Sequence, residues 1–138
     1  MEVSVLIIDD NVLLNTIQRT LIKNTWPTGK LLACYDGQTA LHVLDEEAGS
    51  GKKVLVLLDI NMPVMDGWDV LDSLQNKPYQ DNIYVVMNSS SDSEKDELRA
   101  MHYEQVIAFN KKPLTGEVLA EIVRDTPLSY FFADPISK

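Results

Sequence analysis

Cysteine, long apolar runs and basic side chains are all scarce in this sequence of 138 residues. Cys34 is the single cysteine, which excludes an internal disulfide and a cluster of thiolate metal ligands. The longest apolar runs, Val3–Ile8 and Val54–Leu58, are far shorter than the roughly 20 residues that span a bilayer. The chain also lacks the basic start and small-residue cleavage site of a signal peptide. We therefore expect a soluble, cytoplasmic protein.

Basic residues are outnumbered by acidic ones. The chain has 12 Lys and Arg residues against 21 Asp and Glu, which gives a formal net charge of -9. Nucleic-acid binding and attraction to anionic membranes both need clustered basic residues, so neither partner is expected. The hydrophobic fraction of 45% is ordinary for a globular protein, and the length suits one domain with a real core.

Five short apolar runs alternate with stretches that carry apolar residues at helical spacing. The runs, typical of strands buried on both faces, are Val3–Ile8, Leu31–Cys34, Val54–Leu58, Ile83–Met87 and Val106–Phe109. The helical stripes are Leu14, Ile17, Leu21 and Ile22; Ala40, Leu41, Leu44 and Ala48; Trp68, Leu71 and Leu74; Leu98 and Met101; and Val118, Leu119, Ile122 and Val123. This alternation predicts a single α/β domain whose parallel sheet carries helices on both faces.

The ends of the predicted strands carry three carboxylates, a hydroxyl and a lysine. Asp9 and Asp10 follow the first run, and Asp59 follows the third. Ser89 lies near the end of the fourth, and Lys112 follows the fifth. Each residue alone is typical of a cap, a turn or a solvated side chain. At one edge of a sheet, however, three carboxylates repel one another and favour a cation such as Mg²⁺, while the lysine suggests a bound phosphoryl group.

These residues form a pattern that resembles a known family. The pattern consists of Ile8-Asp9-Asp10, Leu58-Asp59-Ile60-Asn61-Met62-Pro63-Val64-Met65-Asp66-Gly67, Ser89 and Lys112-Pro113. It resembles the receiver domain of two-component response regulators, in its stand-alone chemotaxis-regulator-like (CheY-like) form. The resemblance implies a flavodoxin-like (βα)5 domain over residues 1–125, with five parallel strands in the order 2-1-3-4-5. Residues 126–138 are expected to be a tail without an output domain, in which Tyr130, Phe131 and Phe132 pack back on the body.

The resemblance also assigns roles in phosphoryl transfer. Asp59 would be the phosphoacceptor, taking its phosphoryl group from a sensor histidine kinase or a histidine phosphotransfer protein. Asp10, Asp59 and the backbone carbonyl of Asn61 would hold Mg²⁺, and Asp9 would act through a water on the metal. The loop after Asp59 would be shaped by its Met-Pro and Asp-Gly pairs, Gly67 allowing a turn that few residues can make.

Further residues would sense and transmit the phosphorylation. Lys112 and Ser89 would contact phosphoryl oxygens. Ser89 and Phe109 would then switch the face made by the fourth helix, the fifth strand and the fifth helix, where a downstream protein binds. The implied role is signalling rather than enzyme activity on a separate substrate, although the chain would catalyse its own phosphorylation and slow dephosphorylation.

Several positions depart from the usual family pattern, among them Ser89, Phe109 and Asn88. Ser89 stands where Thr is commoner, and Phe109 cannot donate the hydrogen bond that Tyr could. Asn88 stands where an apolar residue is usual. A buried amide needs hydrogen-bond partners, so Asn88 is expected either to face the site or to cap the fourth helix.

Other functions fit the sequence less well. A phosphatase of the haloacid-dehalogenase type would need a second Asp at the position of Asn61 to shuttle a proton. An FMN carrier would need a hydroxyl-rich loop where Asp9 and Asp10 would repel phosphate. A nucleotide-binding P-loop around Gly49–Lys52 fails its own spacing. The remaining alternative is a phosphorylation-independent interaction module of the same fold, against which the presence of Asp59 and Lys112 argues.

Overall fold

The computed structural model describes residues 3–26, 29–90 and 93–129, so Tyr130, Phe131 and Phe132 lie outside the described residues. Within these ranges five strands alternate with five α-helices. They are β1 (Val3–Ile8), α1 (Val12–Thr25), β2 (Lys30–Cys34), α2 (Gly37–Glu47), β3 (Lys53–Asp59), α3 (Gly67–Leu74), β4 (Ile83–Ser89), α4 (Glu94–Ala100), β5 (Val106–Lys111) and α5 (Gly116–Arg124), with a 3₁₀ turn η1 (Gln80–Asn82) before β4. All strand pairs are parallel, in the order β2-β1-β3-β4-β5. The predicted fold class and strand order are confirmed.

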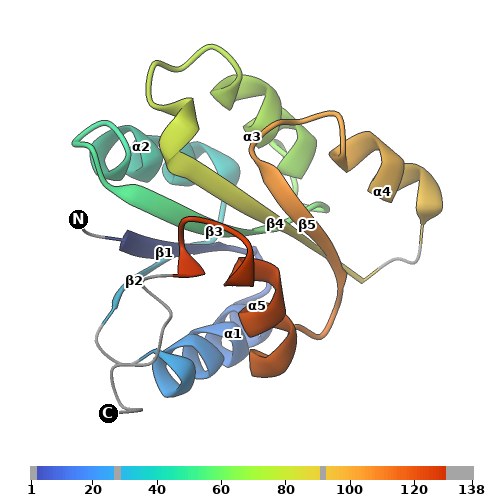
Figure 1. Ribbon diagram of the computed structural model, residues 1–138. Coiled ribbons are helices and arrows are strands. Elements are labelled where there is room, and N and C mark those ends of the chain that lie inside the picture. The colour runs from blue at the N-terminus through green and yellow to red at the C-terminus, as the bar shows by residue number, and fades with distance from the viewer. Residues whose placement is uncertain (1–2, 27–28, 91–92, 130–138) are drawn as a thin grey trace.

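Helices cover both faces of the sheet (Figure 1). Because side chains alternate along a strand, each central strand contributes to two separate cores. On one face, Ile7 and Leu57 pack in the cluster that includes residues of α1 and α5. On the other, Leu6 and Leu58 pack in the cluster that includes residues of α2, α3 and α4. The sheet is therefore buried on both sides, and its carboxyl edge is the part left for chemistry.

Three strands continue further than their apolar runs predict. β3 extends to Asp59, β4 to Ser89 and β5 to Lys111. The added residues still pair across the sheet, with Asp59 opposite Asn88 and Asn88 opposite Asn110. The backbone ladder thus reaches one or two residues into the polar segment, and it holds these side chains at fixed positions along the edge.

Each α-helix is preceded by a residue whose side chain accepts a hydrogen bond from a backbone N–H in the first turn of the helix. This bond satisfies one of the N–H groups that have no partner within the helix. The capping residues are Asn11, Asp36, Asp66, Ser93 and Thr115. The cap of α4 is therefore Ser93 rather than Asn88. In the part of the chain that the structure describes, every helix is too short or too polar to cross a membrane.

Helix α1 buries only part of the stripe that its apolar residues predict, since Ile22 lies in the core and Leu21 packs against it. Ile17 is 53% exposed, whereas the amides Asn15 and Gln18 are buried. The Asn15 Nδ2 donates to the carbonyls of Asp9 and Cys34, at 3.0 and 3.1 Å. These carbonyls lie at the ends of β1 and β2, so the helix turns its amides toward them and leaves Ile17 outside.

The stripe predicted for α4 is wrong. Leu98 and Met101 are largely exposed, and Ala100 is the residue that enters the core. The guanidinium of Arg99 lies 4.2 Å from the ring centre of Trp68 on α3. Ala100 packs into the core and Arg99 lies against the Trp68 ring, so this side of α4 faces the protein. The larger apolar side chains of Leu98 and Met101 therefore point to solvent.

Candidate functional site

Three carboxylates meet at the carboxyl ends of the neighbouring strands β1 and β3. Asp9 and Asp59 are buried, while Asp10 is exposed. One oxygen of each residue lies within 4.8 Å of one oxygen of each of the others. The structure therefore brings together the three acids that the sequence predicts to meet.

Lys112 reaches the same place from the end of β5. Its Nζ lies 3.0 Å from Asp9 Oδ2 and 3.2 Å from Asp59 Oδ1, and its side chain is 13% exposed. The backbone N–H of Lys112 donates to the carbonyl of Ser89 at 2.6 Å, and the bond to Pro113 is cis. This hydrogen bond holds the loop after β5 against the end of β4. The lysine side chain extends across β4 to the acids.

The charges at this edge are unbalanced, which changes the pKa values of the groups involved. Burial raises the pKa of Asp59; the Lys112 ammonium acts against this, and the Asp9 carboxylate adds to it. Burial alone would lower the pKa of Lys112, but its hydrogen bonds and charge interactions with Asp9 and Asp59 outweigh burial and raise it. One ammonium faces three carboxyl groups. The site therefore has an excess of negative charge, which a bound cation would balance.

Asp9 is held from several directions. The N–H of Asn11 donates to its Oδ1 at 2.9 Å, and Gln18 Nε2 donates to its Oδ2 at 3.2 Å. The Asn15 amide fixes its carbonyl. The apolar pattern of α1 missed both amides; their spacing of three residues, which places them on one helix face, is the signal that could have found them.

Gly67 lets the chain after β3 fold back against the phosphoacceptor candidate. A Cβ at Gly67 would lie 2.6 Å from the carbonyl oxygen of Asp59, and the Gly67 N–H donates to the Ile60 carbonyl at 2.8 Å. The glycine predicted here is required, but for close approach of two backbone segments and not for a left-handed turn. Within this loop the left-handed residue is Val64, with φ 68°, a conformation that a β-branched side chain rarely adopts.

Asn88 turns into the protein, toward α1 and β5. Its Nδ2 donates to Gln18 Oε1 at 3.2 Å, and its Oδ1 accepts from Asn110 Nδ2 at 2.9 Å. Of the two placements predicted for this amide, capping of α4 is excluded. Asn88 instead contacts the residue that holds Asp9, and so lies behind the acids.

The other predicted site residues surround the acids. Ser89 is buried at the end of β4. Asn61 is exposed in the loop two residues after Asp59. Phe109 on β5 is partly buried against the core on the side of α2, α3 and α4.

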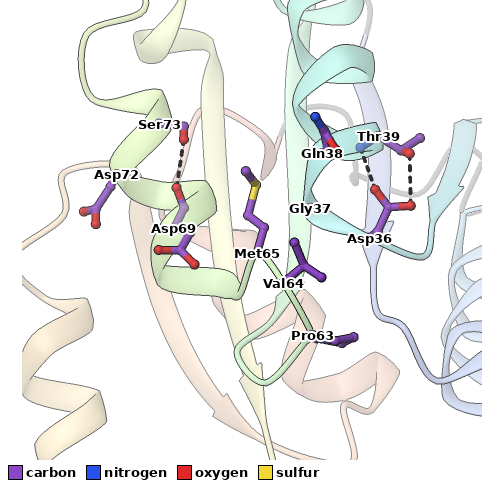
Figure 2. Close-up of a pocket in the computed structure, with 10 residues that line it drawn as sticks. All are labelled: Asp36, Gly37, Gln38, Thr39, Pro63, Val64, Met65, Asp69, Asp72 and Ser73. Carbon is purple, nitrogen blue, oxygen red and sulfur yellow. Dashed lines mark hydrogen bonds between the residues drawn. The ribbon is translucent and has the colours of Figure 1, made fainter.

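A separate hollow of about 890 Å³ lies between α2, the loop after β3 and α3 (Figure 2). Of the three carboxylates among its described lining residues, two already serve in helix caps, and the third, Asp72, accepts from the Tyr103 hydroxyl at 2.6 Å. Asp36 accepts from the N–H and the hydroxyl of Thr39, and Asp69 accepts from the N–H of Asp66. None of the three clustered acids is among its described lining residues. The candidate site is therefore the edge around Asp59 and not this hollow.

Comparison with known proteins agrees with the fold. The sequence profile of the response regulator receiver domain matches residues 5–124. A probable methanogenesis regulatory protein, FilR2 of Methanothrix harundinacea, is 33% identical over 100 residues, which cover 71% of this chain and 64% of that protein. The chain thus spans just under two thirds of this relative's length.

Solved structures show the same fold. A two component response regulator from Cytophaga hutchinsonii has a TM-score of 0.80 and 28% identity, over 89% of this chain and 95% of that one. The chemotaxis protein CheY4 of Vibrio cholerae has a TM-score of 0.74 at 17% identity, over 90% and 98% of the two chains. Since the receiver profile covers most of the sequence, the chain belongs to the response regulator receiver domain family of two-component signalling.

Proposed function

We propose that Asp59 accepts a phosphoryl group from a phosphohistidine of a sensor kinase or phosphotransfer protein, and that this modification changes what the domain binds. The observation that carries the proposal is the meeting of Asp9, Asp10, Asp59 and the Lys112 ammonium at one edge of the sheet. A structural ion pair would need one carboxylate for one lysine. Three carboxylates beside one lysine suit a site that binds a cation and a phosphoryl group together.

The donor set fits Mg²⁺, which prefers oxygen ligands and usually binds one or two carboxylates. Asp10, Asp59 and the backbone carbonyl of Asn61 would hold the ion, and Asp9 would support it less directly. Bound there, Mg²⁺ would offset the repulsion between the anionic acceptor and the anionic donor.

The remaining chemistry belongs to side chains of this chain. A carboxylate oxygen of Asp59 bonds to phosphorus, the bond from phosphorus to the donor's nitrogen or oxygen breaks, and the leaving group keeps that electron pair. Lys112 already lies beside Asp59, where its ammonium can pair with a phosphoryl oxygen. The Ser89 hydroxyl would donate to another oxygen of the product.

The Mg²⁺ dependence of phosphorylation tests this proposal. Incubation with acetyl phosphate and Mg²⁺ is expected to add the mass of one phosphoryl group to the intact protein, and chelation of Mg²⁺ is expected to prevent it. An Asp36→Asn variant, altered at an exposed capping carboxylate, should behave as the wild type does. Absence of the adduct, or an equal yield after chelation, would refute the proposal.

Exposed apolar side chains offer binding surfaces for the two kinds of partner. Val12 and Leu13, the first two residues of α1, lie close to Asp10 in the sequence and are largely exposed. They support a protein as the phosphodonor. Leu98 on α4 and Met101, which caps the end of that helix, are equally exposed and support a downstream protein at the face made by α4, β5 and α5. Phe109 lies on β5, within this second face, and is partly buried.

Switching is expected to extend from Asp59 to α4 and β5. In amide NMR spectra, beryllofluoride with Mg²⁺, which mimics the phosphoryl group, should shift the signals of Phe109 and Leu98 as well as those next to the acids. Because the mimic acts only through contacts that differ between two states, shifts confined to the loops after β1 and β3 would favour a passive adaptor.

A further inference from the structure

Three buried amides form a continuous hydrogen-bonded path behind the acidic site. Asn110 Nδ2 donates to Asn88 Oδ1 at 2.9 Å, Asn88 Nδ2 donates to Gln18 Oε1 at 3.2 Å, and Gln18 Nε2 donates to Asp9 Oδ2 at 3.2 Å. The three side chains are 9%, 2% and 7% exposed and come from β5, β4 and α1. The path, hereafter the amide relay, therefore connects three separate elements to one carboxylate.

The direction of the relay follows from the charge of Asp9. An ionised carboxylate only accepts hydrogen bonds, so Gln18 must present its NH₂ group to it. The Gln18 carbonyl then faces Asn88, which must donate, and the same reasoning orients Asn110. All three amide dipoles consequently point their positive ends toward Asp9, and aligned hydrogen bonds of this kind strengthen one another.

Packing alone does not account for these side chains. A buried amide adds stability only if its hydrogen bonds are made, and apolar residues of similar shape can replace a paired set at little cost. The relay instead orients the carboxylate of Asp9. Gln18 and Lys112 donate to the same oxygen of Asp9, so Gln18 would keep this carboxylate oriented while Lys112 pairs with a phosphoryl group.

We propose that Gln18 is a positioning residue for Asp9, and that Asn88 and Asn110 fix Gln18 and connect the acidic site to β5 through the amide relay. The inference rests on the proposed function, because it assigns the relay a purpose at the same Mg²⁺ and phosphoryl site. It also gives β5 a second connection to the site, since Asn110 lies directly between Phe109 and Lys111.

Mg²⁺ affinity and stability, measured on the same variants, separate positioning from packing. Gln18→Leu should weaken Mg²⁺ binding, measured by calorimetry, roughly 3- to 10-fold; this is at or below the low end for groups that orient metal ligands, because Asp9 supports the ion indirectly. Exposed Gln38 on α2 provides the matched control, and Gln38→Leu should leave the affinity unchanged.

A triple variant, Gln18→Leu with Asn88→Leu and Asn110→Leu, removes the whole relay and leaves none of its amides unpaired. It should recover stability to urea lost in the single variant but not the Mg²⁺ affinity. Recovery of both, or an unchanged affinity in Gln18→Leu, would show that the relay serves packing alone and overturn the inference. Failure of the wild type to bind Mg²⁺ would instead refute the proposed function and the inference with it.

The wild-type protein gives an independent readout. As Mg²⁺ is added, the side-chain NH₂ signals of Gln18, Asn88 and Asn110 should all shift with one common dissociation constant. In Asn88→Leu the Asn110 signal should stop responding while that of Gln18 still does. Wild-type signals of Asn88 and Asn110 that do not respond to Mg²⁺ would contradict a relay.

Discussion

Replacing Lys112 by methionine is expected to lower the free energy of unfolding by about 3 kcal/mol in the absence of Mg²⁺, as removal of one partner from a buried ion pair generally does. Methionine keeps most of the length and the apolar stem but leaves Asp9 and Asp59 without the ammonium that now lies 3.0 and 3.2 Å from them. Urea denaturation of both proteins, with Mg²⁺ chelated, measures the difference.

Mg²⁺ should reduce this loss, because the ion supplies the positive charge that the variant lacks. Lys95 on α4 is exposed and provides a control, so Lys95→Met should change stability by no more than about 0.5 kcal/mol. An equally small effect of Lys112→Met would show that the lysine does not balance the clustered acids, and would remove the electrostatic basis of the site.

Asp59→Asn should abolish phosphorylation completely and make the Mg²⁺-free protein more stable at neutral pH. The amide cannot act as the nucleophile. Burial raises the pKa of Asp59, so the folded state disfavours its carboxylate, and an uncharged amide avoids this cost. Intact mass after acetyl phosphate treatment and urea denaturation measure the two effects.

The stability gain has a definite pH dependence. A carboxyl group with a raised folded-state pKa destabilises the protein above that pKa, so the gain from Asn should be present at neutral pH. It should disappear as the pH falls below the ordinary pKa of Asp, where the wild-type group is protonated in both states. Lower stability of Asp59→Asn than of the wild type at neutral pH, without Mg²⁺, would contradict this assignment of the site's electrostatics.

The sequence predicts the sheet and the acidic edge well because both depend on local patterns. Continuous apolar runs mark strands that helices cover on both faces, and the residue after each run must lie at the carboxyl edge. Asp9, Asp10, Asp59 and Lys112 could therefore be placed together without coordinates.

The second layer of the site depends on pairings between distant residues. Gln18 and Asn88 are 70 positions apart, and neither is recognisable as a partner of the other from its own neighbours. The same limit explains Ile17, Leu98 and Met101, which helical spacing assigns to the core. Hydrogen bonds of Asn15 and Gln18 set the rotation of α1, and the contact between Arg99 and Trp68 sets that of α4.

Chemical identification of the phosphorylated residue tests the central claim most directly. Borohydride reduces an aspartyl phosphate to homoserine, which tandem mass spectrometry of peptides can locate. After treatment with acetyl phosphate and Mg²⁺, the account predicts homoserine at position 59 and at no other aspartate. Homoserine in place of Asp9 or Asp10, or none anywhere in the chain, would contradict it.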